Sequence, residues 1–355
     1  MLTIEQFAEE VQKKHAEHYG VSQDKVGEGF SLEPDKEIKL STDISQTDGF
    51  LNLVNTVTTS KESGGSLVIQ NVNRITQTND TANGQERRPV GITPPVPNEF
   101  KMEKAHSDWK VHDDILDYWA QLPNYLQMYR NTFLAAMAQD RAIIGFHGTH
   151  HAVTSDLSTN PLMQDVNIGW FELVRQRAPQ QIVTEGANAG QIRIGSTGDF
   201  ANLDMLIFDM VSSIPMWKRQ GLVAVVGNGL LAASQAKLYE AQADLPSEKE
   251  RIQNKLVIGT YGGLPTISAA FLPENGVMVT SLKMNGNTAA NLSIYEQKNT
   301  WKRSSEYVPK LEHMIDWNKR KECYHVEDFD RIKLLLPAEL VFVDSNKTIT
   351  NDVEV

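Results

Sequence analysis

Cysteine is nearly absent from the sequence, since Cys323 is the single one among 355 residues. One thiol cannot form a disulfide within a chain, and such scarcity is typical of proteins in a reducing compartment. Long apolar runs are missing too, because none approaches the roughly 20 residues that a membrane-spanning helix needs. The opening MLTIEQFAEEVQKK has acids where a secretory signal needs basic residues and an apolar core. We therefore expect a soluble protein of the cytoplasm, with no targeting peptide and no membrane contact.

Positive charge is also scarce: 34 Lys and Arg stand against 45 Asp and Glu, which gives a formal net charge of −11. Tight sequence-independent binding to nucleic acid needs clustered cations, so this balance argues against it. The chain has no G-x-S-x-G, no H-E-x-x-H and no Walker loop. Two acidic pairs are better explained as charges at helix starts or on solvated faces: Asp113–Asp114 and Glu306–Glu312. We predict that the protein is not an enzyme.

The strongest enzymatic candidate is LVAVVGNGLLAA, where Gly227, Gly229 and Ala232 fit the loose G-x-G-x-x-A fingerprint of dinucleotide binding. An apolar strand precedes the motif and a helix follows it, as the fingerprint requires. The acidic residue expected about 20 residues later is missing, because that region is the polar EAQADLPSEKE. A plain strand–turn–helix explains the motif better. We expect no cofactor, and a nucleotide-dependent oxidoreductase stays only as an alternative.

The motif HGTHH places His147, His150 and His151 close together in the chain. Imidazoles three or four residues apart on a helix can converge on zinc. Two glycines interrupt the helix here, and no nearby Cys or carboxylate completes a ligand set. We therefore predict an exposed polar loop and no metal.

The first thirty residues form a separate unit. A capping box of Thr3 and Gln6 opens a predicted helix that Gly20 ends. The helix carries apolar and aromatic residues at helical spacing: Ile4, Phe7, Ala8, Val11 and His15. An isolated amphipathic helix must bury its apolar face. Two interpretations stay open: a helix docked on its own subunit, or a temporary segment that contacts another chain and is later removed.

Residues 58–102 contain an unusually long polar stretch. A strand-like SLVIQNV leads into it, and Asn83-Gly84 is a strong two-residue hairpin signal. A long hairpin with almost no apolar face is not stable alone, so it is either flexible or laid across a neighbouring subunit. The cluster of Glu86, Arg87 and Arg88 suits polar contacts with such a neighbour, although a solvated turn also explains it.

A long helix is predicted from Pro123 to about Phe146, because proline fits the first helical position. Its apolar face consists of Leu126, Tyr129, Phe133, Ala136, Met137 and Ile144. Gly145 and Gly148 end this rod, which is roughly 35 Å long. The face is a core stripe and not a cofactor site.

The stretch TSDLSTNPLMQDVNIGW, residues 154–170, follows that helix. Its polar residues can bond the backbone locally, and Pro161 fixes one direction. These polar residues are Ser155, Asp156, Ser158, Thr159 and Asn160. The apolar residues that can anchor the loop in the core are Leu162, Met163, Val166, Ile168 and Trp170. We predict a rigid loop, which either presents an edge to a neighbouring subunit or has no partner.

Several stretches together resemble one family. The segment 154–170 after AIIGFHG, GQERRP in the hairpin, NLSIYEQKNTWKRSSEY and HVEDFD occur in the order found in the major capsid proteins of P2-type tailed phages, the gene-N product family. The resemblance covers nearly the whole chain. It implies an α+β fold of the HK97 capsid type, with an N-terminal arm, an extended β-hairpin loop, a peripheral domain with a long spine helix, and an axial domain.

The resemblance also suggests a domain division. Residues 1–30 would be a processed segment, 31–62 the arm, 63–110 the extended loop, 111–215 with 301–355 the peripheral domain, and 216–300 the axial domain. Residues 216–300 contain short strand-like runs around a helix, divided by Gly, Pro and Asn-Gly turns. This pattern independently predicts a compact α/β or α+β unit.

The resemblance further implies a function and partners. The protein would assemble as pentamers and hexamers into the icosahedral head of a tailed phage and enclose double-stranded DNA without sequence-specific binding. Its partners would be copies of itself, an internal scaffolding protein with a linked protease, the portal and decoration proteins. An encapsulin-like cargo shell is the alternative with the same fold.

Two sites follow from these expectations. Asn83, Gly84, Glu86, Arg87 and Arg88 are predicted at a subunit interface. In the resembling family the N-terminal segment is trimmed, which places a cut between Phe30 and Ser31. We expect the surrounding GEGFSLEP, residues 27–34, to be extended and accessible because of its glycines and proline.

Overall fold

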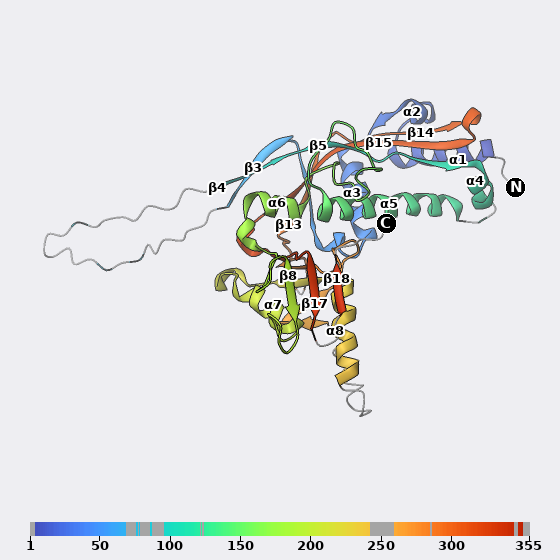
Figure 1. Ribbon diagram of the computed structural model, residues 1–355. Coiled ribbons are helices and arrows are strands. Elements are labelled where there is room, and N and C mark those ends of the chain that lie inside the picture. Colours follow the sequence, from blue (N-terminus) through green and yellow to red (C-terminus); the bar gives the residue numbers. More distant parts are fainter. Residues whose placement is uncertain are drawn as a thin grey trace.

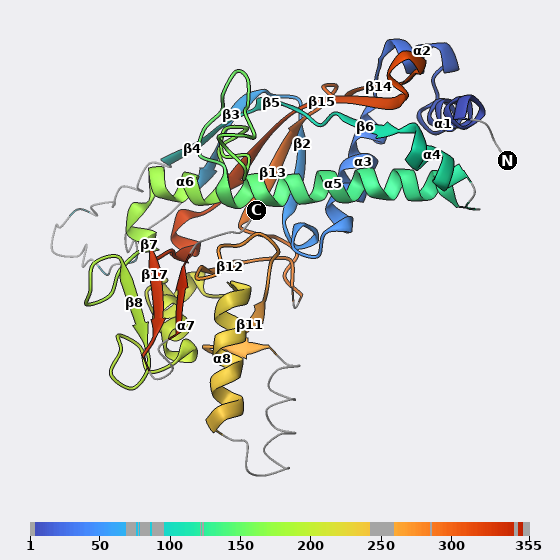
Figure 2. The same ribbon diagram turned by 45° about the vertical axis from the view of Figure 1, so that its right-hand side comes forward.

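A long helix, a curved sheet on one side of it and a second unit on the other make up the molecule (Figure 1). The computed structural model describes residues 4–68, 76, 78, 86, 96–120, 122, 124–241, 259–284, 286–343 and 347–350. Both views place the helix α5 (Tyr125–His147) between the two parts (Figures 1 and 2). A two-stranded ribbon of β3 (Ser63–Val68) and β4 (Val96–Lys101) lies beyond one end of α5. The predicted α+β class is confirmed.

The helix α5 matches the predicted rod closely. It begins at Tyr125, and Pro123 lies outside the described residues, as does the side chain of Leu126. Four residues of the predicted apolar face are buried: Tyr129, Phe133, Met137 and Ile144. Ala136 is exposed, so its assignment to this face was wrong. At about 100° per residue, it points about 200° away from both Leu134 and Ala138, which are buried.

The larger sheet has seven strands and centres on β15 (His313–Val326). Its order is β1 (Phe30–Ser31), β14 (Lys302–Val308), β15, β13 (Leu292–Gln297) and β2 (Asn55–Thr59), with β5 (Glu103–His106) and β6 (Trp109–His112) also paired to β15. Alternate residues of β15 are buried: Met314, Asp316, Asn318 and Arg320. Because side chains alternate between the faces of a strand, this part of the sheet buries one face, which includes polar groups. From Glu322 to Val326 every residue of β15 is buried, so both faces are covered there.

The second unit is built on a six-stranded sheet. Its order is β10 (Thr260–Tyr261), β11 (Leu264–Ile267), β9 (Leu222–Val226), β12 (Val277–Ser281), β16 (Lys333–Leu335) and β7 (Ile182–Val183). A three-stranded sheet of β18 (Lys347–Thr350), β17 (Glu339–Phe342) and β8 (Gln191–Ile194) lies beside it, with α7 (Leu203–Ser212) and α8 (Asn228–Ala241).

The strand β9 joins two cores. Val223 and Val225 pack in the core around α5, whereas Leu222, Ala224 and Val226 pack in the core of the second unit. A strand that is covered on both faces needs a continuous apolar run, which is the reason for LVAVV in place of an alternating pattern. The two units are therefore fused through a shared strand, without an intervening linker.

The remaining helices cover the larger sheet and its edges. They are α1 (Ile4–Tyr19), α2 (Gln23–Glu28), α3 (Pro34–Thr47), α4 (Asp113–Ala120) and α6 (Trp170–Arg177). Short 3-10 turns lie at Leu51–Leu53, Pro179–Gln181, Met216–Lys218, Pro309–Leu311 and Phe329–Arg331. The predicted first helix and its stop are confirmed, because α1 ends at Tyr19 and Gly20 has a φ of 70°.

The strand pairing crosses the predicted domain limits. β13, in the predicted axial domain, pairs with β15 of the predicted peripheral domain, and β16 of the predicted peripheral domain pairs with β12 of the axial one. β5 and β6 belong to the larger sheet although they overlap the predicted loop 63–110. The division into five parts stays a proposal. Its limits would have to be redrawn by which sheet each strand joins, because strands from different predicted parts share one sheet.

Candidate functional site

The base of the ribbon β3–β4 is fixed to the larger sheet. Asn98 donates a hydrogen bond of 2.6 Å to the Val326 carbonyl, and Phe100 stacks on Tyr295 with ring centroids 4.7 Å apart. Arg177 donates to the Asn98 side-chain oxygen at 2.6 Å. The ribbon therefore leaves the sheet in a defined direction, whatever its far end contacts.

The predicted interface residues fall, in the sequence, between β3 and β4. Asn83, Gly84, Arg87 and Arg88 are outside the described residues, and Glu86 is exposed. Their role stays a prediction.

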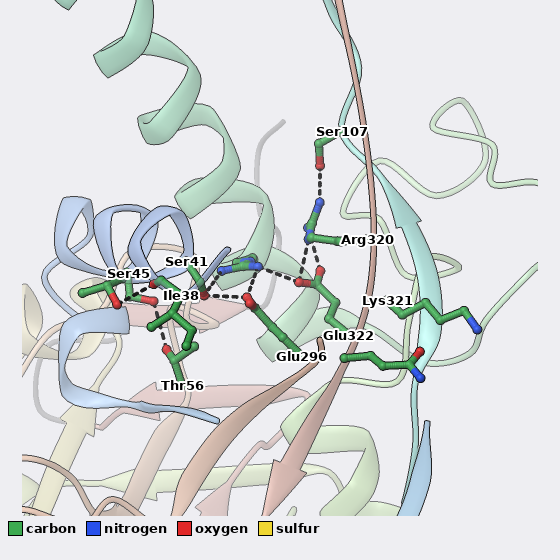
Figure 3. A network of polar contacts seen from close by, with 12 residues as sticks. Ile38, Ser41, Ser45, Thr56, Ser107, Glu296, Arg320, Lys321 and Glu322 are labelled. Atoms are coloured by element: carbon green, nitrogen blue, oxygen red, sulfur yellow. Dashed lines mark hydrogen bonds and ion pairs between the residues drawn. The ribbon is translucent and has the colours of Figure 1, made fainter. Parts of the chain in front are cut away.

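A buried ion network connects α5 to the larger sheet and to α3. Arg141, on α5, donates to Glu296 of β13 and, at 2.9 Å, to Glu322 of β15. Figure 3 shows the chain of contacts continuing on both sides of this pair of glutamates. Ser41 of α3 donates to Glu296 at 2.6 Å, and Arg320 holds both oxygens of Glu322 at 2.6 and 2.7 Å. Four elements thus meet at one set of charges.

The network is charge-balanced and sealed from solvent. Arg141 is 0% exposed, and Glu296, Arg320 and Glu322 are each 1% exposed. Burial alone would raise the pKa of Glu322, but Arg320 and Arg141 lower it to about 2. Trp301 contacts both guanidinium groups, whose carbons lie 5.9 and 5.4 Å from its ring centroid. Fully paired buried charges fix geometry strongly, because losing one partner leaves another charge uncompensated.

The predictions from the sequence do not include this network. Arg141 occupies the buried stripe of α5, four residues after Met137 and three before Ile144. A cation on an apolar helical face is a sign of a buried counter-charge. The partners Glu296 and Glu322 are more than a hundred residues away in the sequence, so the position of Arg141 could not identify them.

The helix α1 is docked on its own subunit. Phe7, Ala8 and Val11 are buried in a small core with Leu116 and Tyr129, which Val111 and Met314 complete. Burying such an apolar face stabilises a helix that could not persist alone. Of the two interpretations left open, docking is confirmed for this state of the chain, and later removal stays a proposal.

The expectation of an extended, accessible segment at 27–34 is met only in part: Phe30–Ser31 is extended as a strand and Ser31 is exposed, but both ends of the segment are helical. Gly27 lies in α2, and Pro34 opens α3 at its first turn. Phe30 and Ser31 form β1 and pair with Arg303 and Lys302 of β14. Proline is compatible with a helix start, and glycine with a short helix, so neither residue enforces an extended chain.

The loop 154–170 makes the local hydrogen bonds and the core contacts that the sequence predicts. The Asp156 side chain accepts from the Ser158 backbone at 2.9 Å, and the Asp156 carbonyl accepts from the Asn160 backbone at 2.9 Å. Thr159 also donates to that carbonyl, at 3.2 Å. Trp170 is fully buried, and Met163, Val166 and Ile168 pack against the same core.

Three glycines allow this loop to cross the end of α5. A Cβ on Gly145 would lie 2.6 Å from a ring atom of Trp170, and one on Gly169 would lie 2.6 Å from the Gly145 carbonyl oxygen. A Cβ on Gly148 would meet the Gly169 nitrogen at 3.0 Å. These approaches leave no room for side chains, so the crossing depends on glycine at each position.

The three histidines of HGTHH do not converge. His147 Nε2 lies 2.7 Å from the Phe271 carbonyl, His151 Nδ1 lies 2.7 Å from the Val166 carbonyl, and His150 faces Thr149. Among the described residues, no three His, Cys, Asp or Glu are grouped to hold a metal. The predicted polar loop fits this geometry.

The dinucleotide motif has a structural explanation. A Cβ on Gly227 would clash with the carbonyl oxygens of Pro273 and Glu274, and Leu230 donates its backbone N–H to Glu274 at 3.2 Å. A turn of the chain therefore occupies the start of α8, where a pyrophosphate would have to lie. Gly227 serves a close approach of backbone to backbone, whereas Gly229 lies against the side chains of Glu274 and Ile349.

The acidic pairs also have ordinary surroundings. Asp113 and Asp114 open α4, and Glu306 and Glu312 are exposed.

In the described part of the chain, no helix combines the length and apolarity needed to cross a membrane.

The second unit presents an apolar surface to solvent. Met205 and Phe208 on α7 are 53% and 59% exposed, and Met216 and Trp217 on the following turn are each 79% exposed. We call these four residues the α7 surface. Where such side chains form a contiguous patch, they mark a protein interaction site.

Comparison with known proteins identifies the family of this chain. A family model described as "Phage major capsid protein, P2 family" matches residues 7–335. The chain belongs to this family. It is 29% identical over 325 residues to the "Capsid proteins" of Escherichia phage P2, covering 88% of each, and 25% identical over 323 residues to the "Major capsid protein" of Serratia phage KSP20, covering 89% and 90%.

Solved structures agree with the family. One chain of the "Satellite phage P4 procapsid including size determination (Sid) protein" has 28% identity and a TM-score of 0.65, covering 84% of this chain and 98% of that one. A chain of the capsid of a native GTA particle, at 16% identity and TM-score 0.51, covers 82% and 89% and shows the fold alone. The HK97-type fold is confirmed.

This major capsid protein is therefore a shell-forming structural protein that assembles with copies of itself. The family decides against the nucleotide-dependent oxidoreductase, and it favours a phage head over an encapsulin-like compartment.

Proposed function

We propose that copies of this subunit close as pentamers and hexamers into an icosahedral head around double-stranded DNA, in the host cytoplasm. The match to the capsid family over residues 7–335 carries this proposal. The formal net charge of −11 supports it, because an acidic inner wall repels phosphate and leaves packaged DNA free to move.

The assembly contacts would use the ribbon and the α7 surface. Asn83, Gly84, Glu86, Arg87 and Arg88 would contact the next subunit from the ribbon's far end. The α7 surface would pack on another copy, since Trp217 has the size and exposure typical of an interface anchor. Further partners would be a scaffolding protein with its linked protease, the portal and decoration proteins.

Deleting residues 81–88 is expected to leave a folded monomer that does not close shells. The fixed base of the ribbon preserves the sheet, whereas the contacts at its far end are lost. Trp217→Glu should block assembly too, because each copy would bury an unpaired charge. The measurement is negative-stain microscopy after co-expression with the scaffold, with circular dichroism as the control for folding. Normal shells from both variants would refute these interfaces.

We also propose that the chain is trimmed between Phe30 and Ser31. The bond lies in β1, a two-residue strand at the edge of its sheet, so local opening needs only the loss of its pairing with Arg303 and Lys302. Trimming would remove α1 and uncover the small core beneath it. A helix that docks on the uncut chain and is then lost would make expansion of the shell irreversible.

Intact-mass measurement on mature particles is expected to give a chain that begins at Ser31. The same measurement on unassembled subunits should give the uncut chain, because β1 is paired there. A mature protein that still begins at Met1 or Leu2 would refute the cut.

A further inference from the structure

A cavity of about 370 Å³ lies between α1, α3 and α5. Apolar and aromatic side chains from all three helices line it, including Val11, Leu40, Tyr129, Phe133 and Leu134. A volume near the lower end of ligand pockets, about 300–1,000 Å³, suits one or two side chains better than a large cofactor.

Cations surround this cavity. Lys14, Arg130 and Arg303 line it directly. Burial and then Arg130, Lys36, Lys39 and Arg303 lower the pKa of His18, another lining residue, so this histidine lies in a positive field and is neutral at pH 7.

Acids offset part of that charge. The Glu17 carboxylate lies 3.1 Å from the Lys14 amino group, and Asp43 is paired with Arg130. Asp316 opposes Arg303, because the two charges shift the pKa of the lining residue His15 in opposite directions. A local excess of cations remains from Lys36 and Lys39. Such an excess stands out on a chain whose formal net charge is −11.

We propose that this cavity binds an acidic segment of another protein chain, which inserts an apolar side chain between α1 and α5 and places its carboxylates near Lys14, Lys36 and Lys39. An apolar anchor in a pocket with charges at the rim is the usual arrangement of a short-segment binding site. The cationic surroundings select an acidic partner and disfavour a basic one, because like charges at close range repel.

The walls of the cavity come from both sides of the proposed cut. Val11, Lys14 and His18 precede Phe30, whereas Leu40 and Phe133 follow Ser31. Trimming would therefore remove one wall and release the bound segment. This second part rests on the proposed trimming, and the binding itself does not.

A labelled peptide tests the binding on the full chain. The probe is fluorescein-labelled Glu-Asp-Glu-Leu-Phe-Glu-Asp-Glu, followed by fluorescence anisotropy at low salt. Two comparison peptides carry Ser-Ser in place of Leu-Phe, or Lys in place of every acid. We expect the probe to bind and both comparison peptides to bind at least about tenfold more weakly. Equal binding of the Ser-Ser peptide would overturn the proposal, and so would no binding of the probe.

Neighbouring lysines on α1 provide matched variants. Lys14 lines the cavity and Lys13, which is also exposed, does not. Lys14→Glu should weaken probe binding about tenfold, and Lys13→Glu should change it less than about twofold, because only the first charge faces the segment. Equal effects would reduce the interaction to general charge attraction and overturn the site. Gln127→Trp, at an exposed lining position, should also weaken binding by filling the cavity.

The consequence of trimming has its own readout. Capsid protein from mature particles should lose probe binding if its mass begins at Ser31. If its mass begins at Met1 or Leu2, binding should persist, and only the trimming proposal fails. A chain that begins at Ser31 and still binds the probe would overturn the cavity as the site.

Discussion

Replacing Arg141 by alanine is expected to lower the free energy of unfolding by about 3–5 kcal/mol, because it leaves a buried carboxylate without its cation. Glu296 depends on Arg141 for its ion pair, while Glu322 retains Arg320. All of these groups are sealed from water, so solvent cannot replace the lost partner. Urea denaturation followed by circular dichroism measures the change.

Arg130→Ala is the matched control on the same helix. Arg130 pairs with Asp43 at a site where the arginine side chain is 44% exposed. Exposed pairs contribute about 0–1 kcal/mol, so this variant should remain close to the parent. Similar losses for Arg130→Ala and Arg141→Ala would show that the buried network has no special role.

The loss of unfolding free energy caused by Arg141→Ala should also depend on pH. Because the pKa of Glu322 is lowered to about 2, its pairing stabilises the fold above the ordinary glutamate pKa of about 4.3 and is lost as the pH falls through 2. Protonated carboxyl groups no longer need the Arg141 cation. The difference between parent and variant should therefore shrink between about pH 5 and pH 2. A constant difference over that range would contradict this account.

Gly169→Ala is expected to destabilise the fold by about 1–3 kcal/mol, the usual range for overpacking, or by more if α5 cannot shift. The new methyl group would clash with the Ile144 carbonyl oxygen and lie 2.6 Å from that of Gly145. Both are backbone atoms at the end of α5, so no side-chain rotation relieves the contact. Urea denaturation gives the magnitude.

Gly27→Ala is the control for the glycine substitution. A Cβ there meets nothing within 4 Å, and the residue lies in α2. Alanine at such a position should stabilise the uncut chain by about 0.4–1 kcal/mol, because it restricts the unfolded state. Opposite signs for the two variants are expected, and equal destabilisation would argue against the crossing as the cause.

Local patterns in the sequence were sufficient for several elements. α1 and α5 follow from residues three and four apart, and the 154–170 loop follows from short polar side chains that bond their own backbone. The apolar run LVAVV was correctly expected to form a strand, β9. These features depend on neighbours within a few residues, which is the information that a single sequence carries most directly.

Sequence alone also supported the family. Motifs spread over nearly the whole chain indicated a P2-type capsid protein with an HK97-type fold, and the family match confirmed both. Composition and spacing only argued against an enzyme and against a membrane-spanning chain. They could not indicate that the protein forms a shell.

The tertiary structure decided what distant residues do together. Residues 27–34 were expected to be extended and accessible, but the two ends of this segment lie in α2 and α3, and Phe30 and Ser31 pair with β14, more than 250 residues later. Whether a glycine lies in a helix or a loop depends on such pairing, because glycine itself accepts many conformations.

The same holds for the charges at the centre of the molecule. Arg141, Glu296 and Glu322 are ordinary polar residues until α5, β13 and β15 meet and exclude water from them. Their partners are set by packing and not by sequence spacing, and the strength of their interaction comes from burial. The sequence by itself determined the local elements and the family, and only the folded chain determined which charges hold those elements together.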